Sequence, residues 1–431
     1  MKKTGYFLLT IVMMAFIACD ESISETVTYK INEPVFMDMD DFRSSVWVKS
    51  EVHELTGYGK ISYYNGYLYM SEPGKGIHII DNQDPAHPQV VGYIELLGNA
   101  DLSIRNNLLY ADSYIDLVWF DVTNPAQPQL AGRLENVFPE AIPMIENGLG
   151  VDYMMSYGEE RKDKVIVGWK EVERTESVKE RRDGIFWGWF GGDGLVLAEK
   201  NFDTATGGNS INGSMSRFTI YLDYLYVVLN NQLSIFNLSN AQPEKVGEST
   251  YIGFNVETIF SYKNHMFMGT PTGMLIYSVE DPVKPEYKSS IIHAFGCDPV
   301  VVEDDIAYVT VRSGNTCGQN INELIVIDVS NTSDPEKLVS YPMKGPKGLG
   351  IDNKTLFVCD EGLKVYEVDI NASPFTIRSL AHHEGMEGYD VIPFNNVLMM
   401  IAEDGIYQYD YSDIQNIKPL SFLPVANDSI Q

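Results

Sequence analysis

Residues 76–85 read GIHIIDNQDP and residues 116–125 read DLVWFDVTNP. Each stretch contains an apolar run, reaches an aspartate, and meets a proline four residues later. The apolar run is typical of a strand that packs on both faces. The aspartate can accept backbone N–H groups of a turn, and proline, which has no N–H group, prevents the strand from continuing. The 40-residue step between the two aspartates therefore predicts a repeated unit.

The same pattern returns toward the C-terminus, where each later run ends in a polar or acidic residue before a proline. These runs are residues 233–237, 274–278, 323–328, 362–367 and 405–410. The interval from Asp121 to Asn237 is too long for one unit. We therefore expect a degenerate copy inside it, with residues 164–169 (KVIVGW) as its third strand, which gives eight units.

A four-stranded unit of about forty residues cannot bury both faces of its own sheet. Copies of such a unit must stack around an axis, because a linear solenoid would need shorter and more regular repeats. We predict an all-β protein, a β-propeller of four-stranded antiparallel blades over residues 45–426. Eight blades are favoured and seven are the alternative. Residues 45–51 are expected to close the ring by pairing with the last blade near residues 420–425.

The repeats resemble those of the LVIVD family of bacterial propellers. The matching motifs are LVWFD at residues 117–121, LIVID at residues 324–328, and the sequence from Gly76 to Pro85. The resemblance covers roughly residues 60–425 and departs from the family pattern in the degenerate third unit and its insertion. It implies a propeller fold and an extracytoplasmic location, and it does not identify an activity.

The first 18 residues are typical of a lipoprotein signal peptide. Two lysines precede thirteen uncharged residues that end at Ala18, a run too short to cross a bilayer as a helix. The run finishes in FIAC, which resembles a lipobox, so we expect cleavage before Cys19 and lipidation of its thiol. Residues 19–44 are then expected to form a tether between the membrane anchor and the propeller.

Charge and the residues after the anchor bear on location and partners. Asp20 and Glu21 resemble the acidic export signal that some Gram-negative bacteria use for the outer face of the outer membrane. We expect an outer-membrane lipoprotein of the cell envelope, with the cell surface favoured slightly over the periplasmic face. The net charge of −29 repels a phosphate backbone, so nucleic acid is not an expected partner.

Three cysteines remain once Cys19 carries lipid. Cys297 opens the first strand of one unit, and Cys317 lies in the long loop of the same unit. We expect a disulfide between these two in the oxidising envelope, and two unpaired thiols are the alternative. Cys359 lies in an apolar run and is expected to be a small core residue.

The mouth of the central channel, where the first strands begin, is the first candidate site. The fourth unit offers Ser214 or Ser216 there. The other expected channel-mouth binding residues are Lys60, Asp101, Glu140, Glu257, Asp298, Lys347 and Asp390. Carboxylates and lysines converging on one axis would bind a divalent cation such as Ca²⁺ or a basic ligand, or would remain solvated and inert. No other cofactor is expected.

An insertion at about residues 174–213 is the second candidate site. Its aromatic side chains suit stacking on a carbohydrate or contact with a protein, and they could instead cover apolar surface of the propeller. The candidate residues are Phe186, Trp187, Trp189 and Phe190. The loop of residues 313–320, beside Asp298, is a third candidate, although its Gly and Asn are also ordinary turn residues.

Catalytic motifs do not occur in the sequence, which contains no GxSxG, HExxH, P-loop or EF-hand pattern. Adjacent residues His382 and His383 point apart in an extended chain, which argues against a metal site there. We predict a non-catalytic binding or scaffold module of the envelope, with a protein or a glycan as partner. The alternative is a carbohydrate-active enzyme that uses carboxylates at the channel mouth, such as Asp101 and Asp390.

Overall fold

The computed structural model describes residues 26–49, 54–145, 147–152, 155, 156, 158, 161–177, 198, 199, 209–229, 231–253, 256–292, 299–313 and 321–426. Several expectations therefore lie outside the described residues. These are the signal peptide with Cys19, the expected disulfide of Cys297 and Cys317, the position Asp298, and the aromatic residues Phe186, Trp187, Trp189 and Phe190.

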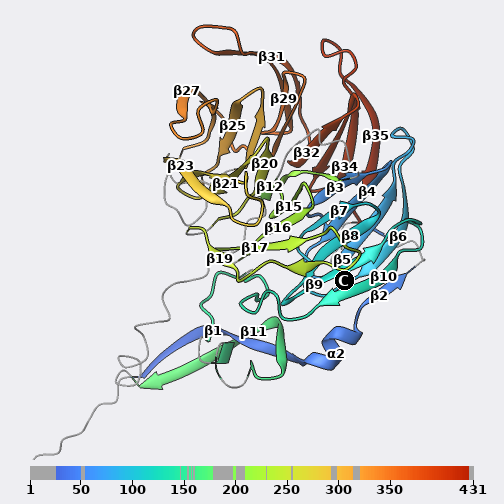
Figure 1. Cartoon of the computed structure of the whole chain (residues 1–431). Coiled ribbons are helices and arrows are strands. Elements are labelled where there is room, and N and C mark those ends of the chain that lie inside the picture. Colours follow the sequence, from blue (N-terminus) through green and yellow to red (C-terminus); the bar gives the residue numbers. More distant parts are fainter. Residues whose placement is uncertain are drawn as a thin grey trace, which may run out of the picture.

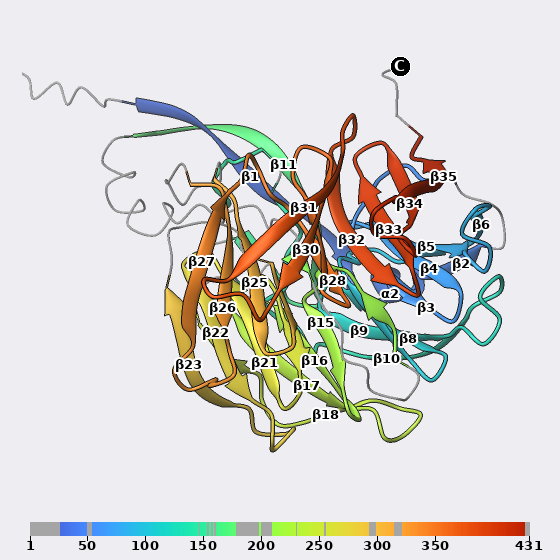
Figure 2. The same ribbon diagram turned by 90° about the horizontal axis from the view of Figure 1, so that it is seen from above.

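Within the described residues, seven sheets stand around one axis as the blades of a propeller, each built on consecutive antiparallel strands (Figures 1 and 2). The first blade contains β3 (Ile61–Tyr64), β4 (Tyr67–Glu72), β5 (Gly76–Asp81) and β6 (Gln89–Glu95). The second contains β7 (Leu102–Arg105), β8 (Leu108–Ser113), β9 (Asp116–Asp121) and β10 (Gln129–Leu134). The third contains β15 (Phe218–Tyr221), β16 (Tyr224–Leu229), β17 (Gln232–Asn237), β18 (Glu244–Lys245) and β19 (Thr250–Tyr251).

The remaining blades follow in chain order around the axis. The fourth contains β20 (Phe260–Tyr262), β21 (His265–Thr270), β22 (Gly273–Ser278) and β23 (Glu286–Ile292). The fifth contains β24 (Val300–Glu303), β25 (Ile306–Val311), β26 (Glu323–Asp328) and β27 (Glu336–Pro342). The sixth contains β28 (Leu349–Asp352), β29 (Thr355–Cys359), β30 (Leu363–Asp369) and β31 (Thr376–His383). The seventh contains β32 (Gly388–Phe394), β33 (Val397–Ala402), β34 (Gly405–Asp410) and β35 (Lys418–Pro424).

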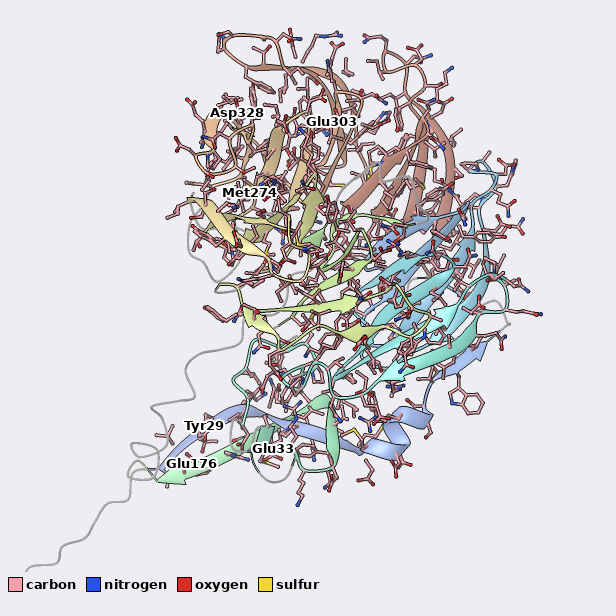
Figure 3. The ribbon with its side chains drawn as sticks, viewed as in Figure 1. Tyr29, Glu33, Glu176, Met274, Glu303 and Asp328 are labelled. Carbon is pink, nitrogen blue, oxygen red and sulfur yellow. The ribbon has the colours of Figure 1, made fainter. Side chains whose placement is uncertain are left out.

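The repeated runs of the sequence occupy equivalent third strands, from β5 in the first blade to β34 in the seventh. The turn chemistry that follows them is also as predicted. The carboxylate of Asp81 accepts the N–H of Gln83 at 3.0 Å, and that of Asp121 accepts the N–H of Thr123 at 2.8 Å. Figure 3 shows Asp328, the equivalent residue of the fifth blade, at the outer end of its strand. The prediction of a propeller with four-stranded antiparallel blades is confirmed.

The hydrophobic core lies between the blades. Each pair of neighbouring blades encloses one cluster of buried apolar side chains, as the prediction from two-faced strands requires. Ile79 of β5 and Ile104 of β7, for example, share the cluster between the first and second blades. Cys359 is buried between the sixth and seventh blades, so its prediction as a core residue is confirmed.

The favoured number of eight blades is wrong, and the stated alternative of seven is correct. Residues 164–169, expected as the third strand of an extra blade, belong to β11 (Lys164–Ser177). This strand pairs antiparallel with β1 (Thr26–Asp38) outside the ring, and we call the two strands the ribbon (Figure 1). Val165 is buried against Phe42 and Ile115, so the apolar run satisfies its packing without three further strands.

The segment expected to be a tether is partly regular structure. Residues 26–38 form β1, and residues 39–44 form the helix α2 (Met39–Ser44). Figure 3 shows Tyr29 and Glu33 of β1 along the ribbon with Glu176 of β11. The sequence did not predict β1 because its partner strand, β11, lies more than a hundred residues away along the chain. No helix among the described residues is long and apolar enough to cross a membrane.

The ring closes differently from the prediction. Residues 47–49 form β2 (Trp47–Lys49), which pairs with β6 as an extra outer strand of the first blade. The first and seventh blades each already have four consecutive strands, so they meet through side chains instead of a shared strand. The amides of Asn82 and Gln408 exchange two buried hydrogen bonds of 3.0 and 2.6 Å across this junction.

Candidate functional site

The axis of the propeller is crossed by residues 209–217, which we call the axial segment. It contains β13 (Ile211–Asn212) and β14 (Ser214–Met215), and β14 also pairs with β12 (Ala198–Glu199). Strand β13 pairs with β3 of the first blade, and the N–H of Ser210 donates to Ile104 of the second blade at 2.6 Å. The predicted insertion thus returns to the centre of the ring and joins the innermost strands of several blades.

The same segment reaches the opposite side of the ring. The hydroxyl of Ser214 accepts the N–H of Leu349 in the sixth blade at 2.8 Å. The N–H of Ser214 donates to the carboxylate of Asp390 in the seventh blade at 3.3 Å. Gly213 is required here, because a Cβ atom at this position would lie 1.8 Å from Oδ2 of Asp390. The axial segment therefore acts as a hub on which the first strands converge.

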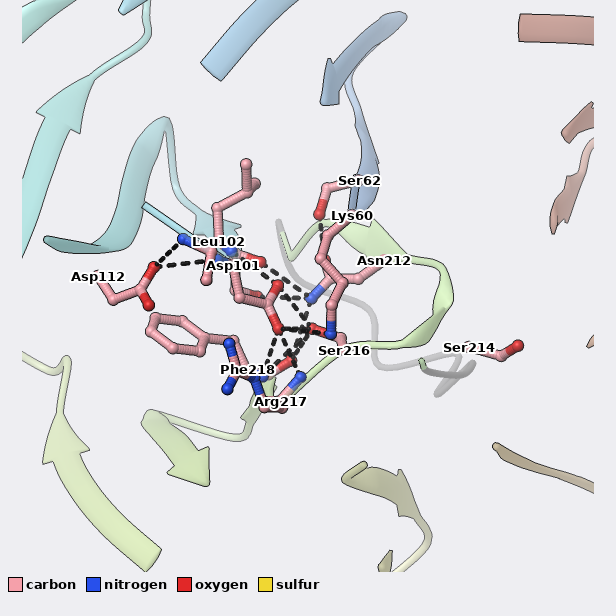
Figure 4. A network of polar contacts seen from close by, with 12 residues as sticks. Lys60, Ser62, Asp101, Leu102, Asp112, Asn212, Ser214, Ser216, Arg217 and Phe218 are labelled. Carbon is pink, nitrogen blue, oxygen red and sulfur yellow. Dashed lines mark hydrogen bonds and ion pairs between the residues drawn. The ribbon is translucent and has the colours of Figure 1, made fainter. Parts of the chain in front are cut away.

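Asp101 is the centre of the polar network around the axis (Figure 4). Its carboxylate accepts the Ser216 hydroxyl at 2.9 and 3.0 Å and the Leu102 N–H at 2.8 Å. It also accepts the backbone N–H groups of Arg217 and Phe218. Nζ of Lys60 lies 3.6 Å from Oδ2 of Asp101, and both side chains are at least 97% buried. This carboxylate is saturated by protein donors and holds blades together.

The expected channel-mouth residues thus converge, but they do not form an open ring. Lys60, Asp101, Glu257 and Asp390 are buried. Lys347 lies 3.3 Å from Glu387 in an ion pair at the edge of the axis. No group of three or more His, Cys, Asp or Glu residues within the described parts of the chain is arranged to hold a metal ion.

Glu140 is the exception, and its expected position is wrong. It lies in an exposed loop after β10 and not at the start of a first strand. The reason is the miscounted blade, because the unit that Glu140 would have opened does not exist. His382 and His383 point apart on β31 as the sequence predicts. The ring of His382 hydrogen-bonds to the carbonyl of Glu361 at 2.9 Å, while that of His383 stacks near Tyr409 at 4.8 Å between centroids.

A separate cavity of about 480 Å³ lies between the ribbon and the propeller. We call the propeller surface beneath it the ribbon face, which is formed by the turns at residues 73–75, 98–100 and 112–114. Residues 141–147 and the strand β11 cover the cavity from the other side. Its volume falls in the range of roughly 300–1,000 Å³ that is usual for small-molecule sites.

Three polar residues form the inner part of this cavity: Asn99, Asp112 and Arg217. One oxygen of Asp112 accepts the N–H groups of Ala100 and Asp101 at 2.8 and 2.9 Å and the amide of Asn99 at 3.2 Å. Burial raises the pKa of Asp112 to about 6, and the nearby Arg217 guanidinium and the N–H donors oppose that rise. A carboxyl of this kind changes its charge near neutral pH.

Two buried polar atoms in the cavity have no hydrogen-bond partner. Arg217 is only 4% exposed, and its Nε has none. The side-chain oxygen of Asn99, which is fully buried, also has none. No described carboxylate lies within ion-pair distance of the Arg217 guanidinium. Buried polar groups are nearly always satisfied in native proteins, so unsatisfied ones in residues that line a cavity call for a partner from outside the protein, either a water or a ligand.

The walls of the cavity are aromatic and held in place. The hydroxyl of Tyr114 donates to the carbonyl of Val167 at 3.1 Å, and the indole N–H of Trp169 donates to the carbonyl of Pro143 at 3.0 Å. Asn32 of β1 and Asn147 exchange two amide hydrogen bonds of 2.8 and 2.9 Å above them. These contacts fix the ribbon and the loop of residues 141–147 to each other, so the cavity is largely pre-formed.

The sequence did not single out Asn99, Asp112, Trp169 or Arg217. A signal for Arg217 exists nevertheless. Lys60, Asp101 and Arg217 each directly precede the first strand of their blade, at Ile61, Leu102 and Phe218. Aligning the units on their first strands would therefore have selected Arg217 in place of the two serines.

Three segments of the chain match the LVIVD repeat, namely residues 59–95, 98–135 and 298–342. They correspond to the first, second and fifth blades. The chain carries LVIVD repeats. This confirms the resemblance to the LVIVD-repeat propellers, and the other blades share the same antiparallel strand order. No curated protein matches the sequence of this LVIVD-repeat chain.

Solved structures similar to this LVIVD-repeat propeller share little sequence with it. A functionally unknown protein from Desulfotomaculum acetoxidans is 10% identical, with a TM-score of 0.52 over 84% of this chain and 97% of its own. The computationally designed Ika8 protein is 10% identical, with a TM-score of 0.47 over 88% and 93%. Hsv2 of Kluyveromyces lactis is 11% identical, with a TM-score of 0.46 over 86% and 100%. Only the first of these likenesses bears on the fold, and it bears on nothing else.

Proposed function

We propose that this protein is a lipid-anchored binding module of the bacterial cell envelope, and that its ligand binds in the cavity on the ribbon face. The observation that carries the proposal is the pair of unsatisfied buried groups, Arg217 Nε and Asn99 Oδ1, in a pre-formed cavity. A glycan end or a small molecule fits this partly open cavity better than a flat protein surface does.

A binding role agrees better with the geometry than the enzymatic alternative does. Asp101 is engaged by several protein donors, and Asp390 accepts the N–H groups of Ser214 and Val391. A carboxylate that is buried and saturated, as that of Asp101 is, is a poor candidate for proton transfer to a substrate. The carbohydrate-active alternative, which needs two working carboxylates at the channel mouth, therefore has no support from the contacts of Asp101.

The binding site can be tested by filling the cavity. Gly168 lines it, and a Cβ atom added to Gly168 meets no atom within 4 Å. The full-length protein and its Gly168→Phe variant should be compared on an array of neutral, amino and acidic glycans. We expect glycan binding by the wild type that the variant loses while its circular dichroism spectrum is unchanged. Binding that the variant retains in full would place the site elsewhere.

The anchor and the location need separate measurements. Mass spectrometry of the mature protein is expected to find an N-terminal Cys19 that carries lipid, and Cys19→Ser is expected to release the protein from the membrane fraction. Proteolysis of intact cells distinguishes the two faces of the outer membrane, because only the surface-exposed form is degraded. Recovery of an unmodified Cys19 in the mature chain would remove the anchor from the proposal.

A further inference from the structure

We propose that the cavity on the ribbon face recognises an acidic sugar, with Arg217 binding its carboxylate and Asn99 accepting one of its hydroxyl groups. This inference rests on the proposed function and specifies the ligand of the same site. Four properties of the described residues support it. These are a cation without an ion-pair partner, an acceptor without a donor, aromatic walls, and the volume of the cavity.

The guanidinium of Arg217 favours a ligand with a negatively charged group. A guanidinium that is 4% exposed and has an unpartnered Nε can donate two parallel hydrogen bonds to a planar carboxylate. Lys60, the other buried cation nearby, is already paired with Asp101. Lys75 at the rim lies 2.6 Å from Glu72, so its charge is also matched. A single cation without an ion-pair partner suits a ligand with one negative charge, most of all when the neighbouring Asp112 is protonated, and it suits a doubly charged phosphate monoester less well.

The side-chain oxygen of Asn99 favours a ligand that carries a hydrogen-bond donor close to its carboxylate. Oδ1 of Asn99 needs an N–H or O–H group, because the amide of Asn99 already donates to Asp101 and Asp112. A ligand hydroxyl close to the carboxylate would satisfy this oxygen. Uronic acids carry both groups on one ring, and so do the carboxylated ends of acidic polysaccharides.

The walls suit the apolar face of a sugar ring. Tyr114 and Trp169 line the cavity, and both polar tips are already engaged with backbone carbonyls, which leaves their ring surfaces as the contact area. Ile142 and Met144 complete the wall on the side of the covering loop. A volume of about 480 Å³ accepts one or two sugar rings and excludes a folded protein.

Isothermal titration calorimetry of the full-length protein tests the assignment with defined probes. These are D-glucuronate, D-galacturonate, neutral D-glucose, D-lactate and inorganic phosphate. We expect at least one uronate to bind about tenfold or more tightly than glucose, because glucose leaves the Arg217 charge unmatched. Equal affinities for glucose and both uronates would overturn the proposal. Tighter binding of phosphate would overturn the carboxylate assignment, and binding of lactate without either uronate would overturn the sugar assignment.

Variants of Arg217 separate the effect of its positive charge from the effect of its planar guanidinium geometry. Arg217→Gln is expected to weaken uronate binding about tenfold or more, and Arg217→Lys should restore part of it because the charge returns without the planar fork. Lys344→Gln is the matched control, since Lys344 is an exposed lysine outside the cavity lining, and its uronate affinity should equal that of the wild type. Unchanged uronate affinity in Arg217→Gln would sink the assignment of Arg217.

The outcome also distinguishes this inference from the proposed function. A neutral glycan that binds the wild type and is lost by Gly168→Phe would leave the cavity as the binding site and remove only the acidic ligand. Uronate binding that survives Gly168→Phe would show an acidic ligand bound at another place.

Discussion

Two regions of this propeller bury charge, and they treat it in opposite ways. At the axis, Asp101 is surrounded by donors and by the ammonium of Lys60. In the cavity on the ribbon face, Arg217 and Asn99 each keep a polar atom without a hydrogen-bond partner. Arg217 directly follows Ser216 of the axial network, and Asn99 lies two residues before Asp101. A satisfied buried charge fixes blades in place, whereas an unsatisfied one that lines a cavity is available to a ligand.

The largest expected effect comes from breaking the satisfied network. Asp101→Ala removes the carboxylate that faces the buried ammonium of Lys60, and it removes the acceptor of several N–H and O–H groups. We expect the free energy of unfolding to fall by about 3–5 kcal/mol, measured by urea denaturation. Asp223→Ala is the control, because Asp223 pairs with Arg105 at a half-exposed position, and its loss should be about 1 kcal/mol or less. A similar loss in both variants would contradict the structural role of the axis.

Crowding the axial segment should have the next largest effect. Gly213→Val places a Cβ atom against the carboxylate of Asp390, so the segment or the seventh blade must shift. A loss of about 1–3 kcal/mol is expected. Gly168→Ala adds the same first carbon into open space and should stay within about 0.5 kcal/mol of the wild type. Thermal unfolding of the two variants measures the difference in their stability. Equal stability of Gly213→Val and Gly168→Ala would show that the axial segment does not fill the centre of the ring.

The third prediction concerns pH and the cavity carboxyl. Burial raises the pKa of Asp112 from 3.8 to about 6, so the folded state binds more protons than the unfolded state between these values. The contribution of Asp112 to stability is therefore fully present below about pH 4 and is lost as the pH rises through 6. Arg217, Asp101 and Tyr114 are the charged or titratable groups that interact with it.

Asp112→Asn tests this prediction because the amide keeps the shape and has no proton to lose in this range. Urea midpoints of the wild type at pH 4.5, 5.5 and 7 should fall by more than those of the variant. Since a bound anion favours the protonated form of Asp112, uronate affinity of the wild type should also rise a few-fold from pH 7 to 5. An identical pH profile for the two proteins would show that Asp112 titrates at its usual pKa.

The smallest effect on stability should come from the unsatisfied cation. Arg217→Met removes a buried charge and keeps most of the apolar stem, so at pH 5, where Asp112 is largely protonated, unfolding should change by no more than about 1 kcal/mol. The same variant is expected to lose uronate binding in calorimetry. A large loss of stability at pH 5 would place Arg217 with Asp101 among the structural charges and erase the distinction between the two regions.

The fold was largely predictable, and the site was not. The runs that end in Asp81, Asp121 and Asp328 predict third strands because each strand is local and carries its own turn signal. The run at residues 164–169 has the same apolar content and lacks that signal, and its true partner, β1, is distant in sequence. The cavity depends on this long-range pairing and on turns from three blades. The residue types alone also do not show that the side chain of Asp101 has all its hydrogen-bond partners and that of Arg217 does not.

The closure of the ring by side chains has a consequence for its topology. The N–H of Ala426 donates to the carbonyl of Leu55 at 2.6 Å, so the first and last parts of the propeller already touch. The consecutive strands of each blade come from one stretch of chain, with β13 and β2 added at the two edges of the first blade, and no strand is exchanged at the junction. A short peptide joining these two points, with a new opening cut between two other blades, should therefore give a circular permutant that keeps the seven blades and lacks β1, α2 and β2.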